Sequence, residues 1–234
     1  SPDRIIRAIA IAVSNGRLAD NLGLGVQLTA ADGSFSFLTP LPDSRFVFVT
    51  VPSGYTATNS FFHRLSAVAN PDTAYFGLRA TPETANPVFR WVQISDPHVR
   101  TDPENGVEFS ADLTEIEELP VPPAFIVVTG DLVETGTQDV QFQNYVAGLA
   151  GHTTPIHSGY GDHDAGPGPL VVEKFEEYLG PTFYFFEYGG IHFVMYNDIH
   201  AADAGGLFIQ HTWLFQDLVT ARARDFPNHD IPII

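Results

Sequence analysis

Three short clusters of acidic and histidine residues, each directly after an apolar segment, constrain this chain more than any other feature. Each apolar segment has the length and composition of a buried β-strand. The clusters are residues 95–98 after segment 89–94, residues 130–134 after segment 124–129, and residues 159–164 after segment 154–158. In open sheets with helical crossovers, ligands bind outside the carboxyl ends of the strands. The pattern therefore predicts three strands that deliver polar side chains to one edge of a sheet.

Helical patterns between and after these strands predict the layers that cover the sheet. Amphipathic segments are expected over residues 108–118, 137–149 and 171–179, and a further helix near residues 210–224. Two apolar segments around Gly189-Gly190 predict a hairpin, residues 184–188 with 191–197, and a last strand is expected at 231–234. The order of strand, crossover and strand predicts an α/β domain over residues 86–234.

Residues 1–85 have a different pattern, in which short strands alternate with turns and no helical period is present. Strands are expected at residues 7–13, 26–29, 34–37, 46–51 and 74–79. This succession predicts a small all-β sandwich as a separate N-terminal domain. Residues 81–87 are expected to be the linker between the two domains, because their two prolines disfavour both helix and sheet.

Composition narrows the classes of partner. The chain has 28 acidic and 11 basic residues, a formal net charge of −17, and 44% hydrophobic residues, which is typical of a globular protein with a core. Such a charge repels nucleic acid and anionic membranes, so neither is an expected partner. There is no cysteine to form disulfides or to bind zinc, and no apolar run is long enough to span a membrane.

The three clusters contain the residue types of a metal centre. Asp96 and His98 are expected to share one face of an extended strand and to bind one cation. Asp131 would bridge to a second cation, which Asp162 would bind. Two neighbouring cations clamp a phosphoester and make a nucleophile from water. The next two residues complete the expected site: His163 as the acid or hydrogen-bond donor for the leaving group, and Asp164 as the residue that holds its imidazole. Glu134 is a candidate for a supporting position behind the ligands.

The order of these motifs resembles the calcineurin-like metallophosphoesterase superfamily. The matching motifs are Asp96-Pro97-His98, Gly130-Asp131-Leu132-Val133-Glu134 and Gly161-Asp162-His163-Asp164. The resemblance covers the chain from Pro87 onward and implies a four-layer α/β/β/α fold. It also implies two divalent or trivalent metal ions (Mn, Fe or Zn), with Asp96, His98, Asp131 and Asp162 as ligands. His163 would be the catalytic histidine, and a metal-activated water the nucleophile.

The first 85 residues resemble the transthyretin-like, or carboxypeptidase-regulatory-like, accessory domain that precedes some bacterial members of this superfamily. The resemblance rests on short motifs, among them residues 14–17, 31–35, 46–49, 52–55 and the aromatic-His-Arg element at 61–64. It implies a secreted or cell-envelope protein, periplasmic or extracellular.

The chain departs from the superfamily pattern in two places. Asp162 stands where the superfamily has Asn, which adds negative charge to a site for a phosphate anion. We therefore expect metal binding to be retained but electrophilic activation to be weaker. The later isolated His and the Gly-His-x-His motif have no counterpart, so the metallophosphoesterase domain is expected to be incomplete at its C-terminus and this piece to lack full activity.

These observations leave several functions open. The first is a metal-dependent phosphohydrolase that acts on small phosphodiesters. A phosphomonoesterase or nucleotide-sugar pyrophosphatase would carry the same motifs, and so would a catalytically degenerate surface binding protein on the same scaffold. Neither the substrate nor the oligomeric state follows from the shared motifs. Of the other histidines, His192 is expected to be packed or hydrogen-bonded in the core, and His152 and His157 flank the third strand without a metal-site pattern.

Overall fold

The computed structural model describes residues 7–12, 25–28, 34, 44–64, 75–165, 172–201, 211, 213–215 and 217–219. The chain divides into two compact units. The first comprises Ser1–Pro87, Phe185–Val194 and His200–Ile234, and the second comprises Val88–Tyr184 and Met195–Ile199. The domain division at residues 85 and 86 stays a prediction. Among the described residues, no helix has the length and apolar character needed to cross a membrane.

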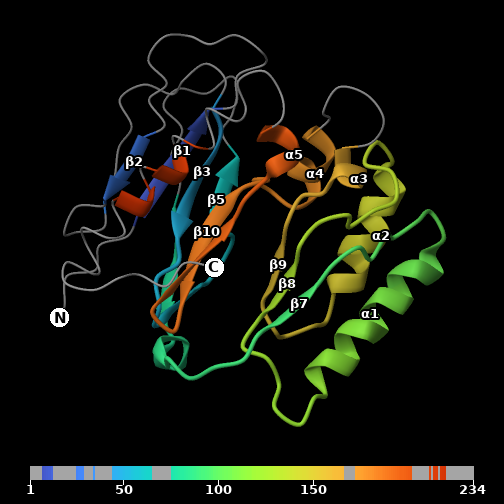
Figure 1. Ribbon diagram of the computed structural model, residues 1–234, viewed down its shortest axis with the longest axis horizontal. Coiled ribbons are helices and arrows are strands. Elements are labelled where there is room, and N and C mark those ends of the chain that lie inside the picture. Colours follow the sequence, from blue (N-terminus) through green and yellow to red (C-terminus); the bar gives the residue numbers. More distant parts are fainter. Residues whose placement is uncertain are drawn as a thin grey trace. The chain divides into compact units, whose positions relative to one another are not determined.

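A parallel three-stranded sheet is the centre of the second unit (Figure 1). Its strands β7 (Val92–Ile94), β8 (Ile126–Val128) and β9 (Ile156–Ser158) lie in the order β7-β8-β9. All three residues of the central strand β8 are buried, as expected of a parallel strand covered on both faces. The three predicted strands and their parallel arrangement are therefore confirmed, and their carboxyl ends meet at one edge.

Helices α1 (Pro103–Glu117) and α2 (Asp139–Leu149) form the crossovers between these strands. Helix α1 begins five residues earlier than predicted, because the side chain of Asp102 accepts a hydrogen bond from the Glu104 amide and Pro103 occupies the first turn. Figure 1 shows α1 beside α2. Their close approach depends on glycine, since a Cβ at Gly106 would lie 2.6 Å from the Asn144 carbonyl oxygen.

The core of the second unit lies where these helices meet the sheet. Phe109 and Leu113 of α1 and Phe142 and Tyr145 of α2 are almost completely buried against β8. The second unit also contains the short helix α3 (Asp162–Ala165) and helix α4 (Glu173–Tyr178). Helix α5 (Asp198–Ala201) spans the border between the two units. Helix α4 confirms the third predicted helix, whereas α3 and α5 were not predicted.

The N-terminal strands form small antiparallel sheets in the first unit. The larger one has the order β2-β1-β3-β5, and the smaller one pairs β4 with β6. Their bounds are β1 (Arg7–Ala12), β2 (Gly25–Leu28), β3 (Ser44–Thr50), β4 (Tyr55–Ala57), β5 (Phe62–Arg64) and β6 (Leu78–Ala80). Strands β4 and β5 were not predicted. The predicted strands at 34–37 and 231–234 lie outside the described residues, apart from Ser34, which is not in a strand.

The predicted linker, in which helix and sheet were both expected to be disfavoured, contains a short 3-10 helix. This helix, η1 (Pro82–Ala85), buries Thr84, whose hydroxyl accepts a hydrogen bond from the Gly54 amide at 2.7 Å. Pro82 is the first residue of η1, and its fixed φ angle already suits the start of a helix.

The predicted hairpin is present as β10 (Tyr184–Tyr188) and β11 (Ile191–Met195). On β11, His192 is buried, and its Nε2 lies 2.6 Å from Oδ2 of the buried Asp217. The prediction that His192 is hydrogen-bonded in a core is therefore confirmed. The described residues between 211 and 219 are helical, in agreement with the helix predicted there.

Candidate metal centre

The edge at which β7 and β8 end carries an unusual backbone. Asp96, His98 and Asp131 have φ angles of 57°, 44° and 51°, and within the described part of the chain they are the non-glycine residues with positive φ. Such residues are strained and need the surrounding structure to hold them. Here the two loops hold each other, because the Asp96 amide donates to the Gly130 carbonyl at 3.2 Å and the His98 amide donates to the Asp131 carbonyl at 3.0 Å.

The predicted placement of Asp96 and His98 on one strand is wrong. Asp96 and His98 do not share a face of an extended strand, because β7 ends at Ile94 and both residues are in the left-handed region. Their side chains converge all the same. His98 Nε2 lies 3.8 Å from Asp96 Oδ1 and 3.9 Å from Asp131 Oδ2. The three residues form a group whose potential ligand atoms all lie within 4.8 Å of one another.

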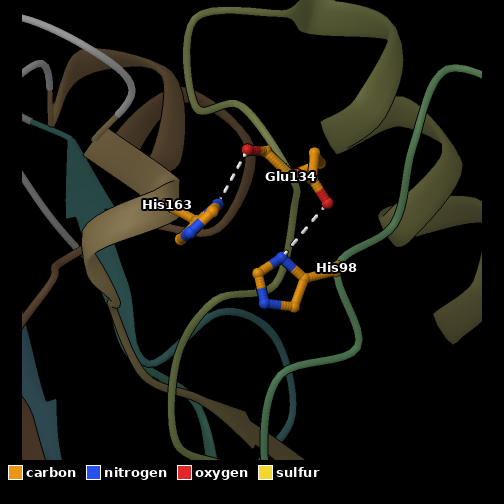
Figure 2. Close-up of side chains that lie close together, drawn as sticks. All are labelled: His98, Glu134 and His163. Atoms are coloured by element: carbon orange, nitrogen blue, oxygen red, sulfur yellow. Dashed lines mark hydrogen bonds and ion pairs between the residues drawn. The ribbon is translucent and has the colours of Figure 1, made fainter.

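Glu134 contacts both histidines of the site (Figure 2). Its carboxylate Oε2 lies 3.4 Å from His98 Nδ1, which is an ion-pair distance without hydrogen-bond geometry. Its main-chain carbonyl accepts a hydrogen bond from His163 Nδ1 at 3.0 Å. Glu134 therefore directs Nε2 of His98 toward the two aspartates, and it fixes the proton of a neutral His163 on Nδ1. The sequence motif identified Glu134 as a supporting residue but gave no sign of the role of its carbonyl.

The third loop brings His163 beside the first two. Its amide donates to Asp131 Oδ1 at 3.0 Å, and its ring packs edge-on against the His98 ring at 4.5 Å between centroids. The pKa of His163 is raised, first by the hydrogen bond to the Glu134 carbonyl and then, against a smaller effect of burial, by the charges of Asp131 and Asp162. A raised pKa favours the protonated imidazole, which is the form that donates a proton.

Asp162 begins helix α3 and is exposed. Its charge reaches both Asp131 and His163, whose pKa values it raises. It does not belong to either of the two groups of potential ligands that the described residues form, namely Asp96-His98-Asp131 and His98-Glu134-His163. Its assignment as a ligand therefore stays a prediction, like those of the other predicted ligands.

Asp164 is completely buried, and its side chain binds main-chain amides. Its Oδ1 accepts from the Val133 amide at 3.0 Å and its Oδ2 accepts from the Gly161 amide at 2.8 Å. Burial raises its pKa to about 7, against the lowering effect of these amides. The expected contact of Asp164 with the His163 imidazole is replaced by the Glu134 carbonyl. Asp164 instead ties the second loop to the third.

Glycines allow the loops to approach this closely. A Cβ at Gly136 would lie 1.6 Å from the Asp164 carbonyl oxygen, and one at Gly161 would lie 2.2 Å from the Asp131 amide nitrogen. Gly130 has a φ of 112° and its missing Cβ would lie 2.9 Å from Gly161. Only glycine fits these positions without a shift of the backbone.

The donor set suits a divalent cation. Two carboxylates and one imidazole converge, and neither carboxylate is within hydrogen-bond distance of the imidazole. Carboxylate oxygen and imidazole nitrogen are the ligands that Mn²⁺, Fe²⁺ and Zn²⁺ accept. Burial raises the pKa of Asp131, and the charge of Asp162 adds to that effect, so a nearby positive charge would stabilise the ionised carboxylate. The residues therefore fit a metal ion.

Two other histidines pack against aromatic or charged side chains away from this site. His157 of β9 packs edge-on against Phe125 at 5.8 Å, and burial lowers its pKa to about 3, so it is neutral. His192 is paired with Asp217 as described above.

Comparison with known protein families places this geometry in context. Residues 89–230, more than half of the chain, match the calcineurin-like phosphoesterase family. A comparison with curated proteins found no match. The matched region contains all three polar clusters and the strands that carry them. The chain therefore belongs to the calcineurin-like phosphoesterase family and is a phosphoric ester hydrolase.

Proposed function

We propose that the chain is a metal-dependent phosphodiesterase with a dinuclear centre. Asp96 and His98 would bind the first ion, Asp131 would be shared, and Asp162 would bind the second. The observation that carries this proposal is the coincidence of backbone strain with ligand convergence. Among the residues that the structure describes, the non-glycine residues with positive φ are the three whose side chains form one group of potential ligands. Strain of this kind persists where the surrounding structure and the function require it.

Bound divalent ions would polarise the phosphoryl group and supply a nucleophile from water at neutral pH. The protein's own contribution is positioning and proton transfer. His163 has its Nδ1 occupied by the Glu134 carbonyl, so its Nε2 is the nitrogen that would meet the leaving-group oxygen. Its raised pKa favours the proton that this oxygen needs. Asp164 holds the second and third loops together by binding the Val133 and Gly161 amides.

The charge of Asp162 influences the strength of this centre. A carboxylate in place of the superfamily's amide repels the phosphate anion and also partly neutralises a bound cation. We infer that the chain holds hard divalent ions such as Mn²⁺ and turns over activated phosphodiesters slowly. Metal binding is thus a more sensitive test of the site than turnover.

The proposal extends to the N-terminal region. The antiparallel order β2-β1-β3-β5 supports a transthyretin-like sandwich that accompanies a four-layer catalytic domain. A secreted or cell-envelope location follows from the same resemblance.

Bound metal is measured first, by elemental mass spectrometry after incubation with Mn²⁺ and buffer exchange. Two ions per chain are expected, and Asp131→Asn should lose both because this carboxylate is shared. Asp112→Asn, which changes an exposed aspartate of α1, is the matched control and should bind as the parent does.

Activity is then compared on bis(4-nitrophenyl) phosphate and 4-nitrophenyl phosphate. Manganese-dependent hydrolysis of the diester that is lost in Asp131→Asn supports the phosphodiesterase. A preference for the monoester would favour the phosphomonoesterase alternative, and two bound ions without turnover of either ester would favour the degenerate binding protein. Stoichiometry unchanged by Asp131→Asn would refute the proposed centre.

A further inference from the structure

A second group of functional side chains lies on the same unit, away from the metal centre. Ser110 Oγ is 3.0 Å from His152 Nε2, and His152 Nδ1 is 2.9 Å from Glu117 Oε2. Ser110 and Glu117 are two helical turns apart on α1, which places them on one face of the helix. His152 lies in the connection between α2 and β9, at the amino end of that strand. The metal centre follows the carboxyl ends of the strands, so the two groups occupy opposite edges of the sheet.

Glu117 is held by main-chain donors that leave one of its oxygens for the histidine. Its Oε1 accepts from the Thr153 amide at 3.1 Å and from the Thr154 amide at 2.8 Å, while Oε2 faces His152. The amide of Thr154, followed by the His152 side chain, lowers the pKa of Glu117 to about 2. The carboxylate is therefore ionised at neutral pH and acts only as an acceptor.

This arrangement fixes the tautomer of His152. Because Glu117 Oε2 only accepts, Nδ1 of a neutral His152 must be the donor. Nε2 then carries the lone pair, and the Ser110 hydroxyl donates to it. The His152 side chain is only 6% exposed, whereas Ser110 is half-buried and so remains in contact with solvent. Serine, histidine and carboxylate in this order and at these distances have the geometry of an activated nucleophile, which is recognised by geometry and not by sequence position.

We propose that Ser110, His152 and Glu117 form a nucleophilic site that accepts acyl groups from activated carboxylic esters. Ser110 Oγ forms a bond to the ester carbonyl carbon while its proton passes to His152 Nε2. The bond from that carbon to the leaving oxygen then breaks, and His152 gives its proton to a basic leaving alcohol or, where an aryloxide leaves as the anion, to solvent. Water then attacks the acyl-serine by the reverse roles, but slowly, because this alkyl ester is less activated than the aryl ester that formed it. The acyl-serine therefore accumulates before the carboxylic acid is released and Ser110 is restored. Glu117 stabilises the imidazolium formed in each half.

The substrate must carry a good leaving group. Ser110 lies within α1, whose main-chain N–H groups are used by the helix itself, so they are not free to stabilise a strongly developed oxyanion. Aryl esters and other activated acyl donors depend least on such stabilisation. This site is independent of the phosphoesterase proposal, because neither its residues nor its reaction involve the metal centre.

The test uses 4-nitrophenyl acetate with the full chain, followed by intact-mass measurement and peptide mapping. One acetyl group on Ser110 is expected in the parent and none at that position in Ser110→Ala, which should fold because alanine favours a helix. His152→Gln should lower the rate of acetylation by about 100-fold or more, the contribution of a positioned general base. The acetylation rate of the parent should follow a single ionisation that His152→Gln abolishes, a dependence that a purely structural role would not produce.

Circular dichroism melting of each variant establishes that it is folded. Acetylation at Ser110 that depends on His152 supports the proposal. Absence of acetyl at Ser110 in the folded parent, or equal rates in the parent and in folded His152→Gln, overturns it and leaves the three residues as a clamp between α1 and the loop before β9.

Discussion

Removal of the Glu117 charge is expected to destabilise the chain in a pH-dependent way, whatever the reactivity of Ser110. The Glu117 carboxylate accepts hydrogen bonds from two main-chain amides and from the His152 imidazole, and its pKa falls from 4.5 to about 2. At about 1.36 kcal/mol per pKa unit, this lowering corresponds to about 3 kcal/mol if the whole effect is realised. Solvent screens a side chain that is 22% exposed, so we expect about 1–2 kcal/mol for Glu117→Gln at pH 7.

The sign of the pH dependence follows from the lowered pKa. A folded-state pKa below the unfolded value means that the stabilisation is complete above pH 4.5 and is lost as the pH falls toward 2. The difference in unfolding free energy between the parent and Glu117→Gln should therefore be constant from pH 8 to about 5.5, and less than half of it should remain at about pH 3.

Urea unfolding followed by circular dichroism at several pH values measures this difference. Asp112→Asn is the control and should change the unfolding free energy by less than about 0.5 kcal/mol, because surface substitutions usually do. A difference for Glu117→Gln that is the same at pH 3 and pH 7 would refute the reasoning, since the stabilisation would then come from packing and not from the ionised carboxylate.

Four further predictions concern the site and the core. Gly136→Ala should destabilise the chain by about 1–3 kcal/mol and reduce Mn²⁺ stoichiometry, because its Cβ would lie 1.6 Å from the Asp164 carbonyl oxygen; thermal unfolding and elemental analysis measure both. Asp162→Asn should raise the turnover of bis(4-nitrophenyl) phosphate several-fold, and an unchanged or lower rate would count against the charge argument. Asp217→Asn should cost about 3–5 kcal/mol in guanidinium unfolding, because it leaves His192 without its buried anion. Mn²⁺ at about 100 times its dissociation constant should add about 2.7 kcal/mol to the unfolding free energy for each ion bound, and EDTA should remove that gain.

Much of the second unit could be predicted because each of its strands is followed by a polar cluster and the central strand is a continuous apolar run. Residues 124–129 contain the buried strand β8, and such a run is typical of a parallel strand covered on both faces. The start of α1 was misplaced because the amphipathic pattern begins after the cap at Asp102 and Pro103. Strands β4 and β5 were missed because neither contains a run of apolar residues: β4 is Tyr55-Thr56-Ala57 and β5 is Phe62-His63-Arg64.

The convergence of the three polar clusters was predictable for a topological reason. Parallel strands have their carboxyl ends at one edge, so residues far apart in the sequence meet there. The contacts between them were not predictable, because several are made by main-chain atoms. The Glu134 carbonyl orients His163, and the Val133 and Gly161 amides bind Asp164. A pattern of side-chain types contains no information about which carbonyl or amide will be free to bind.

The same main-chain contacts explain how so acidic a site can fold. Backbone amides bind Asp131 and Asp164 and offset part of the effect of burial, which raises the pKa of both carboxyl groups. The amides approach because positions 130, 136 and 161 are glycines. Carboxylates bound by amides do not need basic side chains as partners. In the ion pairs that the described residues form at this edge, the arginine is Arg100, whose Nε lies 3.3 Å from Glu134 Oε2. A phosphate ester carries negative charge and would be repelled by the carboxylates that remain. In the proposed centre, metal ions held by those carboxylates would supply positive charge for its binding, so we expect affinity for a phosphodiester to depend on the metal more strongly than the stability of the fold does.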